Sequence, residues 1–242
     1  MSEQQDCRNA CVIVLPSLNP NEKFDRVLDG LLNAGFQKIV IVDDGSAPQN
    51  QVHFERAASF PACRVIHHEV NKGKGRALKN GFRCAMEEFP DAAGVITIDG
   101  DGQHLTKDII ECGNRMLREK RNVVLGCRNF DLPGIPPRSV AGNKTTSKMF
   151  RIVYGIRLSD TQTGLRAIPR EYLERFCAVE GERFEYETNM LLKMKRWGIR
   201  FSEQEIETVY EDENAGSHYN TVKDSWRIFK IMARDLFGRN RK

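Results

Sequence analysis

The chain has 242 residues, of which 40% are hydrophobic and 29% charged, and its formal net charge is +4. These values are typical of a soluble globular protein that is long enough to bury a substantial core. The charge is too small to indicate nucleic acid as a partner, although it fits anionic substrates or an anionic membrane surface.

The first half of the chain alternates short apolar segments with amphipathic ones. The predicted strands cover residues 10–15, 38–42, 64–67, 95–98 and 123–125. The predicted helices cover residues 21–34, 49–59, 75–88 and 107–120. This alternation indicates βαβ units and a mainly parallel sheet, in which ligands bind at the carboxyl ends of the strands.

The second half is less regular. Three prolines and a glycine predict an irregular, mobile loop over residues 130–139. Helices are predicted over residues 140–154, 184–197 and 222–236, and a strand over residues 200–208, with no element assigned to 160–169. There is no internal repeat and no low-complexity linker, so we expect a single domain over residues 1–242.

Cysteine usage and hydropathy bear on the compartment. The seven cysteines are scattered and never form a C-x-x-C pair, which favours buried thiols in a reducing cytosol and gives no zinc-ligand spacing. No stretch reaches the ~18 apolar residues that span a bilayer, and the polar start is unlike a signal peptide. We therefore expect a cytoplasmic protein, compatible with peripheral association at the inner face of the membrane.

Acidic residues follow two of the predicted strands. Asp99 and Asp101 come directly after a strongly apolar strand, with glycines between and after them, and Asp43 and Asp44 follow another. Carboxylates at this edge suit Mg²⁺ or Mn²⁺, whose coordination shells phosphate oxygens commonly complete. The alternative for each pair is a plain Asp-Gly turn. Their position at the same expected edge favours a metal site that binds a nucleotide diphosphate.

Eight short motifs lie on the predicted loops and strand ends. They are Leu15-Pro16-Ser-Leu-Asn19-Pro, Val42-Asp43-Asp44-Gly45-Ser46, Asn71-Lys72-Gly73-Lys74-Gly75, Asp99-Gly-Asp101-Gly-Gln103-His104, Gly126-Cys-Arg128, Asp160-Thr-Gln-Thr-Gly164-Leu-Arg166, Phe184-Glu185-Tyr-Glu187 and Ser217-His218-Tyr. In this order they resemble the family 2 glycosyltransferases, most closely the polyprenyl-phosphate (dolichyl-phosphate) sugar transferases and their bacterial relatives. The resemblance runs from Val12 to about Ile231. It implies an α/β fold of the GT-A (Rossmann-like) type, with a mostly parallel sheet flanked by helices.

The resemblance also implies roles for the donor-side residues. Those that bind the nucleotide-sugar would be Pro16, Asn19, Asp43, Asp44, Lys72, Lys74, Asp99 and His218. A Mg²⁺ or Mn²⁺ ion bridging the donor diphosphate would be held by Asp99, Asp101 and Gln103, and the two aspartates would be catalytic in that sense. Simpler roles remain open: a turn and helix cap at Asp44, a solvated helix start at the two lysines, and a structural role for His104. His218 also stands where dolichyl-phosphate mannose synthases carry lysine or arginine.

On the acceptor side, the resemblance assigns a phosphate to Arg128 and Arg138, and the predicted loop position adds Arg166. A phosphate monoester is already a charged nucleophile and needs no strong general base, whereas a sugar hydroxyl does. Asp160 is the one candidate for such a base, and its alternative role is to cap the turn at Thr161. These residues favour a phosphate acceptor.

The resulting hypothesis is an inverting, metal-dependent hexosyltransferase that moves a sugar from a nucleotide-sugar, UDP-glucose first, to a polyprenyl phosphate. Residues 1–127 would bind the donor and residues 128–242 the acceptor. The helix at 222–236 either meets a membrane or a membrane-protein partner, or packs on the domain. The alternatives are a cell-surface polysaccharide or glycan acceptor and a non-catalytic nucleotide-sugar-binding module. A nucleotidyltransferase is disfavoured because the loop after the first strand lacks glycine and basic residues.

Overall fold

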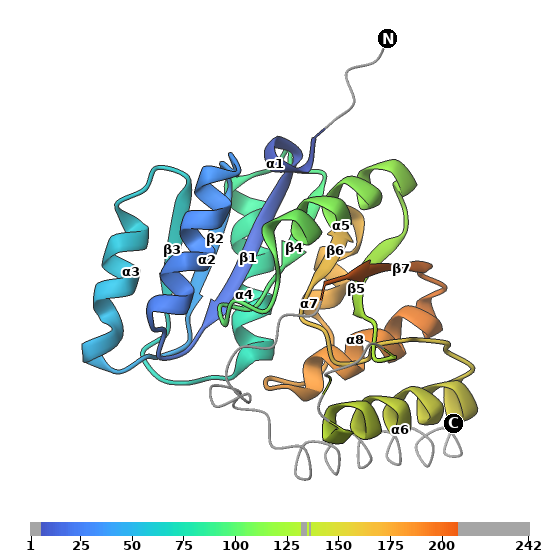
Figure 1. The fold of residues 1–242 in the computed structure, drawn as a ribbon. Coiled ribbons are helices and arrows are strands. Elements are labelled where there is room, and N and C mark those ends of the chain that lie inside the picture. The colour runs from blue at the N-terminus through green and yellow to red at the C-terminus, as the bar shows by residue number, and fades with distance from the viewer. Residues whose placement is uncertain (1–5, 132–134, 136, 208–242) are drawn as a thin grey trace.

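A computed structural model describes residues 6–131, 135 and 137–207 of the chain (Figure 1). One seven-stranded sheet runs through this part, in the order β3-β2-β1-β4-β6-β5-β7. All neighbouring pairs are parallel except those of β6, which is antiparallel to both β4 and β5. The strands are β1 (Cys11–Ser17), β2 (Ile39–Asp43), β3 (Cys63–His67), β4 (Gly94–Thr97), β5 (Val123–Arg128), β6 (Arg166–Pro169) and β7 (Phe201–Ile206). The predicted α/β fold with a mainly parallel sheet is confirmed.

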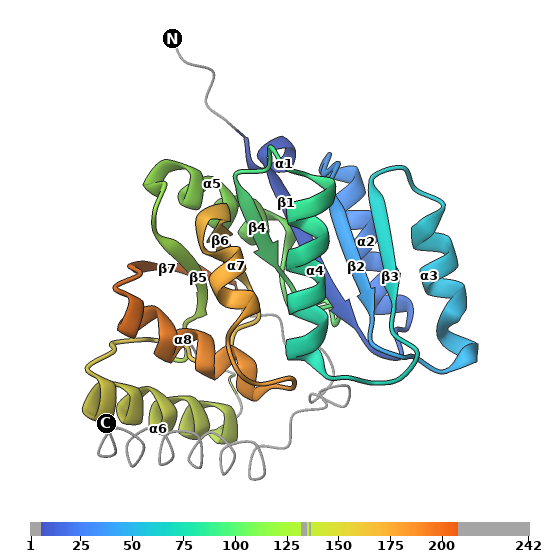
Figure 2. The ribbon, with the colours of Figure 1, turned by 180° about the vertical axis from the view of Figure 1, so that it is seen from behind.

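Helices cover both faces of the sheet. Figure 1 shows α2, α3 and α5 on one face, and Figure 2 shows α4 and α7 on the other, with α8 and α6 below them. The α-helices are α1 (Cys7–Ala10), α2 (Glu22–Asn33), α3 (Gln51–Ala58), α4 (Lys74–Glu88), α5 (Thr106–Glu119), α6 (Pro137–Tyr154), α7 (Leu173–Cys177) and α8 (Glu185–Trp197). There are also two 3₁₀ helices, η1 (Pro48–Asn50) and η2 (Arg170–Tyr172), in the described residues. Within the described residues, no helix is both long enough and apolar enough to cross a bilayer.

The alternation of side chains along β1 divides the core in two. Val12 and Val14 pack into the cluster beneath α4, α7 and α8, whereas Ile13 and Leu15 pack into the cluster beneath α2, α3 and α5. All four side chains are fully buried, as expected for a strand covered on both faces. The continuous apolar pattern therefore identifies β1 as a central strand.

The loop prediction for residues 130–139 is wrong at its end, because α6 begins at Pro137. Proline suits the first turn of a helix, since its fixed φ is helical and it lacks an N–H that would have no partner there. The short strand β6 was not predicted at all. It inserts between β4 and β5, so residues from both halves of the chain share one sheet. The predicted division after residue 127 falls inside β5.

All seven cysteines are free, and most are buried, which confirms the expectation of buried thiols. Burial raises the pKa of the Cys63 thiol to about 11 and that of the Cys7 thiol to about 12. Such thiols stay protonated at neutral pH and are poor nucleophiles. The predicted helix over residues 222–236 lies outside the described residues.

Candidate active site

The carboxyl ends of β1, β2 and β4 meet at one edge of the sheet. Ser17 at the end of β1 is paired with Asp43 at the end of β2, and Val14 is paired with Thr97 at the end of β4. Asp99 follows β4 by two residues. The acidic residues predicted to share an edge are therefore brought to that edge by the register of the parallel strands.

Asp99 is bound to a lysine from the neighbouring helix. The Nζ atom of Lys74, the first residue of α4, lies 2.7 Å from Asp99 Oδ1 and 3.0 Å from Glu187 Oε2 in α8. Burial alone would raise the pKa of Asp99, but the Lys74 ammonium and the nearby His104 ring outweigh it and hold that pKa well below its usual range. Burial would likewise lower the pKa of Lys74, but Asp99 and Glu187 raise it. Both groups are charged at neutral pH.

Asp101 has a different environment. Its Oδ1 accepts a hydrogen bond from the backbone N–H of Gln103, 3.1 Å away. Burial, and then the negative charge of Asp99, raise the pKa of Asp101 above its usual value. The two carboxylates, separated by one residue, thus repel each other. Lys74 neutralises the charge of Asp99, whereas Asp101 forms no ion pair with a described side chain.

This donor set fits a divalent cation. A cation beside Asp99 and Asp101 would relieve the repulsion that raises the Asp101 pKa, and the amide of Gln103 lies in the same turn. The His104 side chain is 7% exposed, with its Nε2 3.5 Å from Asp99 Oδ2, and neither of its ring nitrogens has a hydrogen-bond partner among the described residues. Among the described residues, no three or more His, Cys, Asp or Glu side chains gather into a cation site, here or elsewhere, so a cation at this turn would rest on two carboxylates and an amide.

Gly164 fixes the position of the Asp99 carboxylate. A Cβ atom at residue 164 would lie 2.2 Å from Asp99 Oδ2, which is far inside van der Waals contact. The Gly164 carbonyl also accepts a hydrogen bond of 2.7 Å from the Thr97 hydroxyl of β4. The absence of a side chain at residue 164 is therefore required for Asp99 to lie where it does.

We expect Gly164→Ala to lower sugar transfer by about 100-fold, because displacing a reacting group by about 1 Å has effects of this size. Steady-state turnover against the wild type measures the loss, and thermal unfolding of the same samples shows that the variant is folded. Wild-type turnover by Gly164→Ala would show that the position of Asp99 is not critical.

Both carboxylate oxygens of Asp43 have hydrogen-bond partners in neighbouring residues. Its Oδ1 accepts from the Ser46 backbone N–H at 2.8 Å, and its Oδ2 lies 3.0 Å from both Gln51 Nε2 and His67 Nδ1. Burial would raise its pKa, but these hydrogen bonds outweigh burial and lower it. Asn19, which has a positive φ of 51°, accepts from the Ala47 N–H and ties the end of β1 to the same turn. Pro16 is half-buried in β1 beside this turn.

Asp44 anchors the loop that carries the two lysines. Its oxygens accept from the backbone N–H groups of Lys72 and Gly73 at 2.9 and 2.8 Å. The buried ring of His68 lies 2.8 Å from Asp44 through Nδ1 and 2.8 Å from Asn80 Nδ2 through Nε2. Asp44 is therefore more than a local turn cap, because it holds the loop that leads into α4 and so helps to position Lys74. Lys72 itself is exposed.

Removing the His68 ring should loosen this loop. We expect His68→Ala to cost about 1–3 kcal/mol in the free energy of unfolding, because Asp44 and Asn80 each lose a buried partner. Urea denaturation measures the loss. His67→Ala is the matched control, since that ring is about half exposed (52%) and bonds to Asp43 only, and it should cost less. Equal losses in the two variants would argue against the anchoring role of His68.

The candidate acceptor residues are placed differently from one another. Arg128, at the end of β5, donates from Nε to Asp160 Oδ2 at 2.7 Å and from a terminal nitrogen to Oδ1 at 3.2 Å. Asp160 is fully buried and also accepts from the Gln162 N–H at 2.9 Å, which is the predicted capping role. Both of its oxygens are engaged, so the geometry makes Asp160 a support for Arg128.

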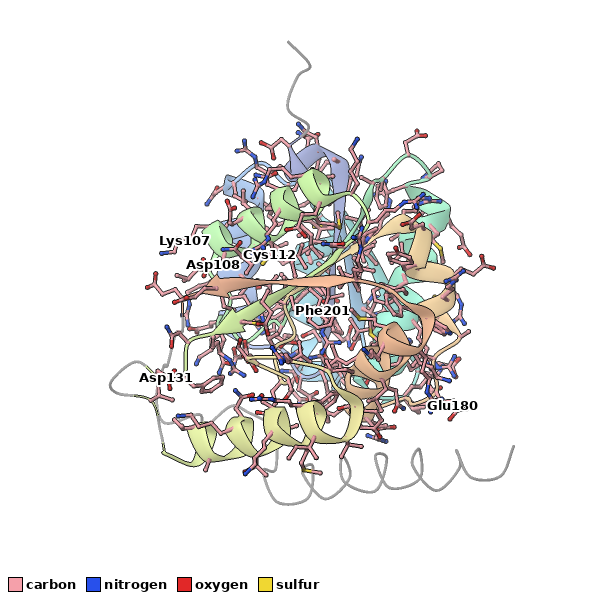
Figure 3. The ribbon with its side chains drawn as sticks, turned by 90° about the vertical axis from the view of Figure 1, so that its right-hand side faces the viewer. Lys107, Asp108, Cys112, Asp131, Glu180 and Phe201 are labelled. Carbon is pink, nitrogen blue, oxygen red and sulfur yellow. The ribbon has the colours of Figure 1, made fainter. Side chains whose placement is uncertain are left out.

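Arg166 does not share this environment. Its side chain is buried in β6, with a terminal nitrogen 3.0 Å from the Glu187 carbonyl oxygen, and it joins β6 to α8. Arg138 belongs to α6, but its side chain lies outside the described part of the chain, as does His218. Figure 3 shows Asp131, which follows β5, near one end of α6. Asn143 of α6 donates to the Ser159 carbonyl and accepts from the Thr161 N–H, and so ties α6 to the segment that carries Asp160.

Residues 12–177 match the sequence model of glycosyl transferase family 2, which is more than half of the chain. The chain belongs to glycosyl transferase family 2. The resemblance stated from the eight motifs is thereby confirmed, and the protein is a glycosyltransferase.

Two curated relatives are similar to this family 2 glycosyltransferase over nearly their whole length. One is a UDP-N-acetylglucosamine–dolichyl-phosphate N-acetylglucosaminyltransferase of Methanococcus voltae, 27% identical over 90% of this chain and 92% of that protein. The other is a polyprenol monophosphomannose synthase of Mycolicibacterium smegmatis, 24% identical over 94% of this chain and 88% of that protein.

Among solved structures, a glucosyl-3-phosphoglycerate synthase from Mycobacterium tuberculosis, in complex with Mn²⁺, UDP and phosphoglyceric acid, has a TM-score of 0.66. It is 15% identical and covers 95% of this chain, which covers 78% of it. At this identity the similarity shows that the fold is shared.

Sequence reasoning gave no role to Glu187, His68 and Gly164. Glu187 lies in a quoted motif, yet its position on Lys74 depends on how α8 packs against α4. His68 belongs to none of the eight motifs, and its contact with Asp44 spans 24 residues of the chain. Gly164 was part of a motif, but its contact with Asp99 joins segments more than sixty residues apart and has no local signal.

Proposed function

We propose that this protein is a metal-dependent, inverting hexosyltransferase that moves a sugar from a UDP-sugar, UDP-glucose first, to a polyprenyl phosphate. The observation that carries the proposal is the pair Asp99 and Asp101 at the carboxyl end of β4, with one carboxylate held by Lys74 and the other lacking an ion pair among the described residues. The two relatives named above support the lipid-phosphate acceptor, since both carry such an acceptor in their names. A UDP donor is supported by one of them.

Separate groups of residues would bind the metal ion, the donor phosphates and the nucleotide. Asp99, Asp101 and Gln103 would hold Mg²⁺ or Mn²⁺, which when bound stabilises the negative charge of the departing diphosphate. Lys74, at the amino end of α4, lies where a second positive charge favours phosphate binding. Pro16, Asn19, Asp43 and Asp44 would shape the nucleotide pocket. These assignments form part of the proposal.

On the acceptor side, Arg128 would grip the lipid phosphate in a forked hydrogen bond, together with Arg138. An oxygen of that phosphate attacks the anomeric carbon as the bond to the nucleoside diphosphate breaks and its electron pair leaves with the diphosphate. No strong base is required, because the phosphate is already charged at neutral pH. This fits Asp160, whose two oxygens are occupied by Arg128 and the Gln162 N–H.

The acceptor also bears on where the protein works. A polyprenyl chain stays in the bilayer, so transfer to its phosphate takes place at the membrane surface. We propose a cytoplasmic protein associated peripherally with the inner face of the membrane, with a membrane-protein partner as a further element of the proposal.

Thermal unfolding against UDP- and GDP-sugars, each with and without Mn²⁺, tests the donor assignment. A donor at 100 times its Kd stabilises by about 2.7 kcal/mol. For a chain of this size the melting temperature rises by about 5–10 °C. We expect that rise with one UDP-sugar and only when Mn²⁺ is present. A rise with a GDP-sugar instead would show that the donor is not a UDP-sugar. An equal rise without Mn²⁺ would argue against a metal-dependent donor site.

A further inference from the structure

The Lys74 ammonium lies between two carboxylates. Its distances to Asp99 Oδ1 and Glu187 Oε2 differ by only 0.3 Å, at 2.7 and 3.0 Å. Lys74 is the first residue of α4, where the positive end of the helix dipole disfavours a cation. The two carboxylates offset that cost, so the position of the ammonium is set by their pull from either side.

Asp99 has little freedom to present another oxygen. Its Oδ1 accepts from Lys74, while its Oδ2 lies 3.5 Å from His104 and against Gly164. A divalent cation held by Asp99 would use one of these two oxygens. In this partly buried turn such a cation would meet the ammonium at short range, and two positive charges there repel strongly.

Glu187, in contrast, is firmly placed. Its backbone carbonyl accepts from Arg166 at 3.0 Å, and its Oε1 lies 3.9 Å from another guanidinium nitrogen of the same residue. It also lies in the first turn of α8, where the helix dipole favours a carboxylate. An ammonium that leaves Asp99 therefore still has a fixed carboxylate beside it.

We propose that Lys74 competes with the divalent cation for Asp99, and that Glu187 is a positioning residue that retains the Lys74 ammonium when the cation binds. The inference rests on the proposed metal site at Asp99 and Asp101. In the absence of the cation, Lys74 neutralises Asp99 and holds the turn in place. When the cation is bound, Lys74 pairs with Glu187 alone and its remaining N–H groups are free for the donor phosphates.

The experiment is a calorimetric titration of Mn²⁺ into the full chain without nucleotide. Lys74→Met should bind Mn²⁺ at least fivefold more tightly than the wild type, because the competing charge is gone. Lys74→Gln is measured beside it, since its amide can donate hydrogen bonds but carries no charge; the same tightening is expected. Lys107→Met, at an exposed lysine in the first turn of α5, is the matched control for general electrostatics and should change the affinity less than twofold.

Glu187→Gln should weaken Mn²⁺ binding at least threefold, since the ammonium then rests on Asp99 alone. In the Lys74→Met background the same substitution should have a clearly smaller effect, because it no longer acts through Lys74. Equal effects of Glu187→Gln in both backgrounds, or Lys74 variants that bind no more tightly than the wild type, would overturn the proposal. Failure of every variant and of the wild type to bind Mn²⁺, even with UDP, would instead reject the metal site on which it rests.

Discussion

Replacing Asp101 with alanine will reduce sugar transfer by about 10³-fold or more, which is the loss expected when charge stabilisation of the leaving group is removed. Asp101 is the carboxylate that Lys74 does not neutralise, so the proposed cation depends on it directly. Turnover is measured with excess UDP-sugar and Mn²⁺. Near-wild-type turnover by Asp101→Ala under these conditions would contradict the proposal that Asp101 holds a divalent cation.

The control for this variant is Asp91→Ala, an exposed aspartate just before β4, which should retain full activity. A second readout does not depend on catalysis. Because the pKa of Asp101 is raised in the fold, its charged form destabilises the metal-free protein at any pH above that pKa. Asp101→Asn should therefore raise the melting temperature of the metal-free protein at neutral pH while it abolishes transfer. A lower melting temperature would contradict the repulsion between Asp99 and Asp101.

The second large effect is expected at Arg128. Arg128→Ala should lower kcat/KM for polyprenyl phosphate by about 100-fold or more, which is the cost of removing a charged hydrogen-bonding partner. It should also destabilise the fold by about 3–5 kcal/mol, because it leaves the buried Asp160 carboxylate without its partner. Transfer assays with varied acceptor and urea denaturation measure the two losses separately.

Two further variants separate the structural loss from the functional one. Arg128→Ala combined with Asp160→Asn removes the unpaired charge, so stability should recover while transfer does not. Arg157→Ala, an exposed arginine two residues before Ser159, should change neither quantity. If the double variant regains transfer together with stability, Arg128 serves the fold and does not bind the acceptor.

The donor half of the site could be predicted because its information is local. Two apolar strands of the first half are each followed by a pair of acidic residues, and parallel register brings the two pairs to one edge. The alternation of strands and helices predicts a parallel sheet, whereas the order of its strands is known from the structure alone. Because the predicted sheet is parallel, the positions of Asp43, Asp44, Asp99 and Asp101 were predicted together.

The rest depends on packing between distant segments. β6 has only four residues, all buried, and its antiparallel insertion between β4 and β5 leaves no periodic signal. Arg166 was predicted to face a phosphate because it was placed on a loop; as part of β6 it points into the core and binds Glu187. Glu187 and His68 act through residues far away in the chain, and neither spacing nor composition indicates such partners.

The most direct test of the proposed function is the product itself. The purified chain is incubated with labelled UDP-glucose, Mn²⁺ and a polyprenyl phosphate, and the organic phase is analysed by mass spectrometry, with a panel of other UDP-sugars in parallel. We expect a polyprenyl-phosphate sugar of inverted anomeric configuration, formed only when Mn²⁺ or Mg²⁺ is present. The absence of sugar on the lipid phosphate with every UDP-sugar and with both metals would contradict the proposed function.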